Sequence, residues 1–384
     1  MKTNILDKLK SYLHIAVIYA GDPSEPNVVQ YKTHNPRYWK SYIDVATDIK
    51  ISLENSGFSH VHLIREDKNL MQKLQYKKIN FAWLNTAGVQ GIDSSAHAAC
   101  VLESLGIPYV GHTPANTMLM DNKHLFKLYL KSSGIKTAPH FLWHHVREED
   151  TYQSRQLALF CKQFEKPEYH ARFQEKTRFI VKPVCGRASQ HVYIANTPAE
   201  VEPLCWRVSR HTNHYVMVEL FLSGAEYCVA AMKPPRMHTD FSPPYEEDVC
   251  CFAHFERRLN GSDRIFTSMD TSPITSDSIR PLDEHTELYL HHLLSHIATK
   301  LYTSLDLYGL IRLDLRMDHA GHLHVLEANP KPDIKSPTEE KTSLVAMGLE
   351  QLHITYDELI LNQLVNTIDH FQMWRPPLLT HFPV

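Results

Sequence analysis

The sequence predicts a protein that combines the α/β and α+β classes, with a parallel sheet followed by paired antiparallel strands. The first hundred or so residues alternate short apolar runs with amphipathic helices, which is the pattern of βαβ units. Later, the strand-like runs 215–222 and 226–232 are joined by a short turn, as are 311–317 and 322–329. The chain has 384 residues, 43% of them hydrophobic, which is enough for two or three domains with real cores.

Composition and charge exclude several classes of protein. The formal net charge of -3 gives no global electrostatic reason to expect nucleic acid or a membrane surface as a partner. No apolar run approaches membrane length, and the start lacks the small-residue cleavage site of a signal peptide. Seven cysteines without CxxC spacing indicate neither a disulfide framework nor a zinc knuckle. We therefore expect a cytoplasmic protein.

The first expected domain, residues 1–112, is a parallel sheet with helices on its faces. A helix with Val45, Ile49 and Leu53 on one side ends at Gly57, and a second helix, 94–105, ends at Gly106. The predicted strands are 14–20, 61–64, 81–84 and 108–110. Glycine-containing loops follow the first and third strands, where open α/β sheets bind ligands, but no GxGxxG occurs and a dinucleotide is not expected.

The second expected domain, residues 113–215, begins with a helix over 113–133. A strand over 178–183 contains Lys182 near its end and runs into a loop of small residues. A lysine at that place suits phosphate, although a solvated surface lysine fits the spacing as well. A helix with a capping box and a proline at its first position starts at Thr197.

The third expected domain, residues 216–384, carries two acids, Glu219 and Glu226, in otherwise apolar strands that read as a hairpin. Buried acids need partners, and nucleotide groups or a structural salt bridge with an arginine would serve. Helices are expected over 283–305 and from 356 to about 370.

A hairpin over 312–333 gives the strongest chemical signal. Alternation places Arg312 and Asp314 on one face, and Glu327 and Asn329 share a face beside Asp314. Oxygen ligands of this kind suit Mg²⁺ with nucleotide phosphates, and an arginine beside them can neutralise phosphate charge. An amphipathic surface hairpin would show the same alternation, but the Asn-Pro pair after Glu327 favours a positioned site for ATP and Mg²⁺.

Together these motifs resemble the ATP-grasp carboxylate-amine ligases, and among them the D-alanine:D-alanine ligases. The resemblance covers most of the chain and implies an ATP-grasp fold with an N-terminal parallel α/β (pre-ATP-grasp) domain. The motifs that carry it, in the family's order, are Tyr109-Val110-Gly111, Asp121 to Lys123, Val181-Lys182-Pro183, Glu219 with Gly224 and Glu226, Arg312 to Asp314, and Leu326 to Pro330.

The resemblance implies roles for individual residues. Lys123 and Lys182 would reach ATP phosphates, and Glu226 would hold the ribose. The adenine would meet the backbone of a hinge made of Glu219, Leu220, Phe221 and Leu222. The magnesium ligands would be Asp314, Glu327 and Asn329. Arg312 would be a catalytic residue that stabilises the transferring phosphoryl group, and Ser189 in the reduced glycine-serine loop is the second catalytic candidate.

The departures from the family concentrate where it recognises amino acids. Glu25 is only a loose match to the glutamate that binds the first amino acid's ammonium, and Lys331 and Asp333 break the usual sequence after Asn329. We therefore expect an ATP-dependent ligase of small carboxylate and amine substrates other than D-alanine, with these three as substrate residues and Lys335 nearby. A homodimer is a family expectation.

Two other readings stay open. A nucleotide-binding pseudo-ligase that senses or scaffolds would also explain the reduced phosphate loop. Metal storage would explain the 26 histidines. His292 and His296 lie four residues apart on a predicted helix and could reach one metal, but no third ligand accompanies them.

Overall fold

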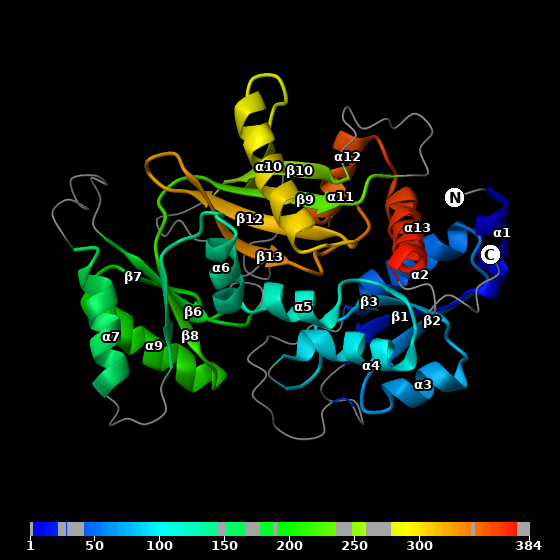
Figure 1. The fold of residues 1–384 in the computed structure, drawn as a ribbon, viewed down its shortest axis with the longest axis horizontal. Coiled ribbons are helices and arrows are strands. Elements are labelled where there is room, and N and C mark those ends of the chain that lie inside the picture. Colours follow the sequence, from blue (N-terminus) through cyan, green and yellow to red (C-terminus); the bar gives the residue numbers. More distant parts are fainter. Residues whose placement is uncertain are drawn as a thin grey trace.

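The computed structural model describes residues 3–21, 28, 42–91, 93–144, 151–165, 177–186, 190–235, 248–258, 278–338 and 342–374. Three lobes lie side by side, each built on one sheet (Figure 1). The parallel sheet is at one end, a five-stranded antiparallel sheet is in the middle and a four-stranded antiparallel sheet is at the other end. The predicted combination of α/β and α+β structure is confirmed.

The N-terminal lobe has a parallel sheet in the order β2-β1-β3-β4. Its strands are β1 (His14–Ala20), β2 (His60–Glu66), β3 (Phe81–Asn85) and β4 (Tyr109–Val110). Its helices are α1 (Thr3–Tyr12), α2 (Ile43–Asn55), α3 (Leu70–Tyr76), the short η1 (Ser94–Ala96) and α4 (His97–Leu105). Gly106 follows α4 with φ +67°, as the sequence predicted for a helix that ends on glycine.

The small lobe at the other end has the strand order β5-β8-β6-β7. Its strands are β5 (His140–Trp143), β6 (Phe179–Pro183), β7 (Tyr193–Ala195) and β8 (Val216–Leu220). The helices α7 (Thr151–Lys162) and α9 (Pro198–Thr212) pack on this sheet and enclose its buried side chains. The predicted strand and helix of this region are both confirmed. The predicted capping box is wrong, because the Thr197 hydroxyl accepts no helix N–H and instead donates to the Glu200 carboxylate at 3.1 Å.

The prediction of one helix over 113–133 was wrong, because the chain breaks at Asn122 into α5 (Pro114–Asp121) and α6 (Lys123–Ser132). Asn122 has an extended backbone, and its side chain accepts a hydrogen bond from the backbone N–H of Leu125 at 3.1 Å. Asparagine is a good N-cap for that reason. Lys123 is therefore the first residue of a helix rather than part of a helix interior.

The central lobe has the strand order β11-β10-β9-β12-β13. Its strands are β9 (Glu226–Met232), β10 (Cys250–Arg257), β11 (Ile279–Pro281), β12 (Ile311–Met317) and β13 (Leu323–Asn329). Its helices are α10 (Leu288–Ser304), α11 (Leu344–Met347), α12 (Leu349–Leu352) and α13 (Tyr356–Trp374). The predicted hairpin of β12 and β13 is confirmed. The helix expected from 283 begins later, because the Asp283 carboxylate accepts backbone hydrogen bonds from His285 and Thr286 in a turn.

The prediction that 215–222 and 226–232 form a hairpin was wrong. Strand β8 pairs with β5 and β6, whereas β9 pairs with β10 and β12. The segment 221–225 instead crosses from the small sheet to the central one. Ser223-Gly224 signals a change of direction, but turn residues do not select the partner of the strand that follows. Because β8 precedes the crossing, we propose domain limits of 1–112, 113–220 and 221–384 in place of the boundary expected at 215/216.

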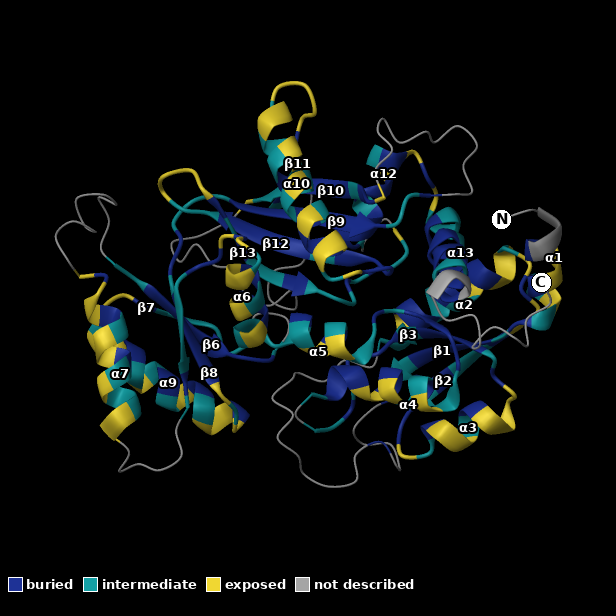
Figure 2. Ribbon diagram, viewed as in Figure 1, coloured by how far each residue is buried: buried dark blue, intermediate teal, exposed yellow. Residues whose placement is uncertain are grey.

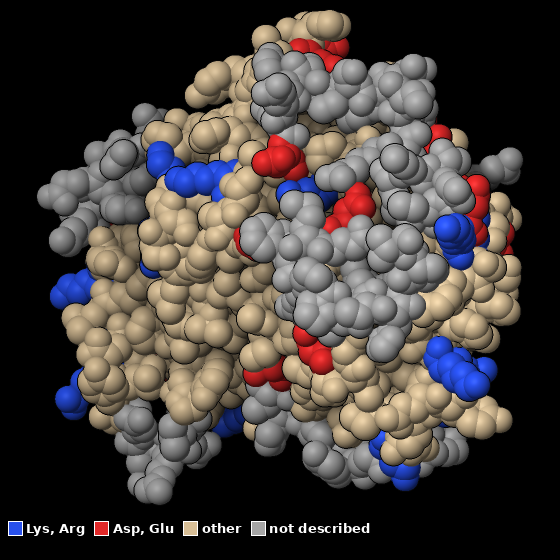
Figure 3. Space-filling view, turned by 45° about the vertical axis from the view of Figure 1, so that its right-hand side comes forward, with Lys and Arg blue, Asp and Glu red and all other residues tan. Residues whose placement is uncertain are grey.

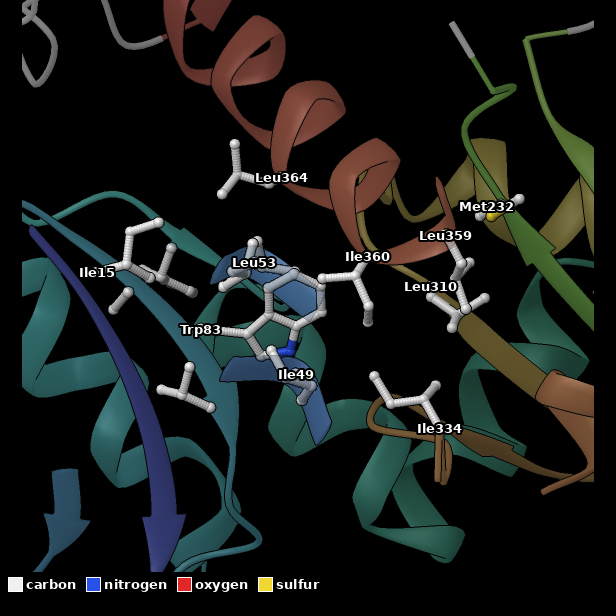
Figure 4. Close-up of a cluster of buried hydrophobic side chains, with 14 of the residues drawn as sticks. Ile15, Ile49, Leu53, Trp83, Met232, Leu310, Ile334, Leu359, Ile360 and Leu364 are labelled. Carbon is white, nitrogen blue, oxygen red and sulfur yellow. The ribbon is translucent and has the colours of Figure 1, made fainter. Parts of the chain in front are cut away.

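Two lobes share a core and the third has its own. In Figure 2 the strands are mostly buried, whereas helices such as α3 and α7 also carry exposed residues. Figure 4 shows Trp83 and Ile49 of the N-terminal lobe, Leu310 and Ile334 of the central lobe and Ile360 of α13 in one apolar cluster. Another cluster packs α6 and α10 against the central sheet. None of the helices in the described part of the chain has both the length and the apolar composition needed to cross a bilayer.

Candidate active site

A cavity of about 880 Å³, including the space open at its mouth, lies between the small sheet and the central sheet. Its walls come from β6, β8, the 221–225 crossing, β9, β12 and β13. The predicted site residues that line it are Lys123, Lys182, Glu219, Leu220, Phe221, Leu222, Glu226, Asp314 and Glu327.

Glu219 is the most enclosed acid of this cavity and contacts two lysines. Lys182 of β6 forms an ion pair with one carboxylate oxygen, and Nζ of Lys127, from α6, lies 3.1 Å from the other. Lys127 is fully buried and also donates to Thr137 Oγ1 at 2.7 Å. Burial raises the pKa of Glu219, but the two ammonium groups outweigh it and lower that pKa to about 2. Glu219 is therefore ionised in the folded protein.

Glu226 contacts two arginines across the sheet. Arg257 Nη1 lies 3.0 Å from one carboxylate oxygen and Arg316 Nη1 lies 3.6 Å from the other. Burial raises the pKa of Glu226 in spite of these cations. The structural salt bridge with an arginine, which the sequence left open for both acids, is present at Glu226, while the partners of Glu219 are lysines.

The crossing between the sheets is held at several points. The Phe221 ring lies between two guanidinium groups, with Cζ of Arg178 4.1 Å and Cζ of Arg316 4.8 Å from its centroid. The backbone N–H groups of Leu220 and Phe221 donate to the carbonyls of Pro139 and Arg178. The start of the crossing is therefore held in one position where it lines the cavity.

The predicted metal residues meet at one end of β12 and β13. Asp314 pairs in register with Glu327, and Arg312 with Asn329. Arg312 donates two hydrogen bonds of 2.8 Å to the Asp314 carboxylate, and Asn329 Nδ2 donates to it at 3.2 Å. Two carboxylates and an amide are the donor types that Mg²⁺ prefers, so these residues fit that ion.

Lys123 links this cluster to the loop that follows β6. Its Nζ lies 3.1 Å from Glu327 and donates to the Gly186 carbonyl, also at 3.1 Å. Burial raises the pKa of Glu327, but Lys123 and Lys182 lower it to about 2, so this carboxylate is also ionised. Ser189 and Glu25 lie outside the described residues.

Lys331 and Asp333 are not brought into this cavity. Lys331 Nζ lies 3.6 Å from the centre of the Tyr42 ring, and Asp333 accepts the backbone N–H of Lys335 at 3.0 Å. Lys335 in turn forms an ion pair of 2.7 Å with Asp48 of α2. Lys331 lines a second, smaller cavity beside the N-terminal sheet.

Sequence reasoning missed three charged residues of the site. Lys127 lies on the buried face of α6 with Phe126 and Leu130, and a lysine within an apolar stripe was the available signal. Arg257 and Arg316 both line the cavity. Arg316 belonged to the alternating charged set of β12, but nothing in the sequence connected it with Glu226 one strand away.

Two antiparallel sheets enclose a cavity lined by lysines and acids, with a parallel α/β lobe beside them. With the family match described next, this arrangement identifies the ATP-grasp class of proteins. Within that class the chain belongs to the D-ala D-ala ligase C-terminus family, whose model matches residues 157–366. It is a ligase that forms carbon–nitrogen bonds. The resemblance predicted from the motifs is confirmed.

Individual relatives agree with this assignment. The D-alanine–D-alanine ligase of Clostridium beijerinckii is 25% identical over 336 residues, covering 82% of this chain and 93% of its own. D-alanine–D-alanine ligase B of Pseudomonas putida is 23% identical over 372 residues, covering 95% and 98%.

Solved structures share the fold at lower identity. D-alanyl-alanine synthetase A of Vibrio cholerae has a TM-score of 0.65 and 16% identity over 93% of this chain and 98% of its own. The Bacillus anthracis D-alanine–D-alanine ligase complexed with ATP has a TM-score of 0.61 and 17% identity over 94% and 99%.

Proposed function

We propose that the protein uses ATP to join a small carboxylate to an amine through an acylphosphate, with release of ADP and phosphate. The observation that carries the proposal is the meeting of Lys123 and Lys182 with Asp314 and Glu327 across one cavity. Two cations for phosphates and two carboxylates for a metal are what phosphoryl transfer requires. The relative whose structure contains ATP supports the choice of nucleotide.

In this proposal the phosphates of ATP lie toward Lys123 and Lys182, the adenine lies against the backbone of 220–222, and the ribose hydroxyls bind Glu226. Asp314, Glu327 and Asn329 would hold Mg²⁺, which neutralises phosphate charge when bound. Lys182, now paired with Glu219, would have to turn toward the phosphates.

The chemistry proceeds in two displacements. A carboxylate oxygen of the donor attacks the γ-phosphorus, the bond to the β,γ-bridging oxygen breaks, and ADP leaves. The amine nitrogen of the acceptor then attacks the acyl carbon, phosphate leaves, and the nitrogen loses a proton to give the amide. Arg312, fixed on Asp314 by two hydrogen bonds, supplies a preorganised positive charge for the oxyanions of both steps.

The substrates are proposed to include an acid or amine other than D-alanine, because Lys331 and Asp333 change the charge of the loop after β13. ADP release against a panel of amino acids and small carboxylates, followed by the mass of the product, tests this. We expect a substrate pair other than two D-alanines, and a loss of activity in Lys331→Ala. Activity with D-alanine alone, unchanged in Lys331→Ala, would contradict it.

The reduced loop 184–189 favours a second candidate, a nucleotide-binding pseudo-ligase. The Asp314→Asn substitution distinguishes the two. Under the ligase proposal, ATP turnover rises with the substrate panel and falls by about 10²-fold or more in Asp314→Asn, a loss typical of removing a group that stabilises transition-state charge. Tight ATP binding without turnover on any pair would favour the pseudo-ligase. A metal analysis of untagged protein separately tests histidine-based storage.

A further inference from the structure

Strand β13 has one residue more than β12 in the pairing between them. Asp314 pairs with Glu327, but the next pair along the hairpin is Leu315 with Val325, so Leu326 is opposite no residue of β12. The strand therefore contains a β-bulge at Leu326. Bulges of this kind often lie beside active sites, where they change the direction of a side chain.

The bulge places two consecutive side chains on the cavity side of the sheet. Val325 and Ala328 belong to the apolar cluster of the central lobe. Leu326 and Glu327, which lie between them, both line the cavity. In a regular strand, neighbouring residues face opposite sides of the sheet, so only one of the two could do so. The bulge therefore sets the direction of Glu327.

The outer edge of β13 is held next to the bulge by residues 136 and 137. β13 is the last strand of its sheet, so its outer side has no strand beside it. The backbone N–H of Val325 donates to the Lys136 carbonyl at 2.9 Å. The Val325 carbonyl accepts a hydrogen bond of 2.8 Å from the Thr137 hydroxyl. One of these two bonds comes from a side chain, so a single substitution can remove it.

The Thr137 hydroxyl is itself held in place from the nucleotide side of the cavity. It is buried and accepts a hydrogen bond of 2.7 Å from Lys127, whose Nζ lies 3.1 Å from Glu219. An ammonium group donates and cannot accept, so the single proton of the hydroxyl is left for the Val325 carbonyl. Lys127 therefore fixes the direction in which Thr137 donates.

We infer that Thr137 is a positioning residue of the site. By holding the Val325 carbonyl it fixes the bulge, and the bulge directs the Glu327 carboxylate into the cavity. The inference rests on the proposed function, in which Glu327 holds the metal ion. Thr137 lies outside every motif that carries the resemblance to the family. Replacing a group that orients a metal ligand typically weakens metal binding by roughly 10–100-fold.

Hydrogen exchange of the full chain, read by mass spectrometry on the peptide that covers 323–329, tests the hold on the bulge. Thr137→Val removes the hydroxyl at nearly constant size. We expect exchange in this peptide to accelerate by roughly five- to tenfold, which corresponds to the loss of one hydrogen bond. Thr137→Ser keeps the hydroxyl and should keep the original rate. Thr137→Cys has a weaker donor, should fall between the two and remains informative if Thr137→Val does not fold.

The matched control is Thr367→Val in α13. Thr367 is also buried, and its hydroxyl also donates to a backbone carbonyl, that of Gln363, at 2.8 Å. The loss of this bond should leave exchange in 323–329 unchanged.

Binding of Mn²⁺ in the presence of ADP, measured by electron paramagnetic resonance, tests the consequence for the metal residue. Mn²⁺ takes the same oxygen ligands as Mg²⁺. Thr137→Val should raise the Kd for Mn²⁺ roughly tenfold or more, whereas Thr137→Ser and Thr367→Val should leave it within about twofold. In a Glu327→Gln background, Thr137→Val should have no further effect, because the carboxylate that it positions is absent. Equal losses of affinity in both backgrounds would overturn the inference.

The two measurements separate this inference from the proposed function. Unchanged exchange in Thr137→Val would overturn the inference, whether or not the protein releases ADP. A loss of Mn²⁺ affinity in Glu327→Gln but not in Thr137→Val would overturn it as well. Faster exchange in Thr137→Val, with Mn²⁺ affinity unchanged in both variants, would support the hold of Thr137 on the bulge and contradict the metal role of Glu327 in the proposed function.

Discussion

The fully buried Lys127 explains how Glu219 can remain charged while its other partner moves. Lys182 is the more exposed of the two lysines and is the one proposed to reach the phosphates. If it leaves, Glu219 keeps Lys127, which is also bonded to Thr137 and cannot reach solvent. The Lys127–Glu219 ion pair would therefore keep the buried carboxylate compensated in the proposed nucleotide-bound state.

Replacing Lys127 with methionine should lower the free energy of unfolding by up to about 3–5 kcal/mol, because one partner of a buried ion pair is removed. Urea denaturation at pH 7 measures the change. The control is Lys131→Met on the exposed side of the same helix, which should change the free energy by less than about 0.5 kcal/mol. Equal losses in the two variants would show that the Lys127 contact does not matter for stability.

Acidic pH should remove the contribution of ionised Glu219 to the free energy of unfolding. Its folded-state pKa of about 2 lies below the ordinary value, so the unfolded state binds the proton more readily. The contribution to stability is present above about pH 4.5, the ordinary pKa of the group, and is lost as pH falls toward 2. It is on the order of 3 kcal/mol.

Urea midpoints of the unmodified protein and Glu219→Gln, taken at pH 7, 4.5 and 3, test this. The two stabilities should approach one another as the pH falls. Parallel pH profiles would contradict the assignment of this charge to Glu219.

At the scale of elements, the 221–225 crossing depends on Gly224 lying against β12. A Cβ at this position would be 2.7 Å from the Met317 carbonyl oxygen, which also accepts the Gly224 N–H. Arg316 Nε donates to the Gly224 carbonyl at 3.2 Å. The crossing thus has little room to change at Gly224, two residues after Leu222, which lines the cavity.

Gly224→Ala should therefore displace the crossing, cost about 1–3 kcal/mol of stability and raise KM for ATP more than KM for the amino acids. The control is Gly321→Ala in the turn after β12, where the φ of +79° adds backbone strain but nothing lies within 4 Å. That variant should lose stability without a change in KM for ATP. An unchanged KM for ATP in Gly224→Ala would contradict a role of the crossing in binding the nucleotide.

Elements with strong local periodicity could be predicted from the sequence. The strands of the N-terminal lobe and the β12–β13 hairpin follow from runs of apolar residues and from alternation. The partner of β8 could not be predicted, because pairing depends on β5 and β6 and not on the turn at Ser223-Gly224. The same limit applies to the site: Asp314 and Glu327 share a hairpin and were found, whereas Lys127 and Arg257 reach their acids from other elements.

At the scale of the whole molecule, the N-terminal and central lobes should unfold together and the small lobe by itself. Residues of α13, among them Leu359, Ile360 and Leu364, pack into a cluster shared by the first two lobes. The small lobe has a separate cluster that includes Trp143 and Phe179. Surface charge does not distinguish the lobes in this way. On the described part of the face in Figure 3, both acidic and basic side chains are present.

Ile360→Ala should cost about 2–5 kcal/mol, because it removes a fully buried side chain from the shared cluster. Hydrogen exchange should accelerate for the amides of β1, β3 and β9 together, and remain unchanged for those of β6 and β8. The matched control is Val208→Ala in the small lobe's core, which should reverse the pattern. Acceleration of all five strands in either variant would indicate a single cooperative unit.

The position of α13 also has a consequence for the order in which the protein can fold during synthesis. Tyr109 and Trp83, near the start of the chain, share their apolar cluster with Phe371 and Ile360, near its end. When the ribosome has made only the N-terminal lobe, these side chains lack the helix that covers them. Part of the apolar surface of this lobe therefore stays exposed until α13, residues 356–374, has been translated.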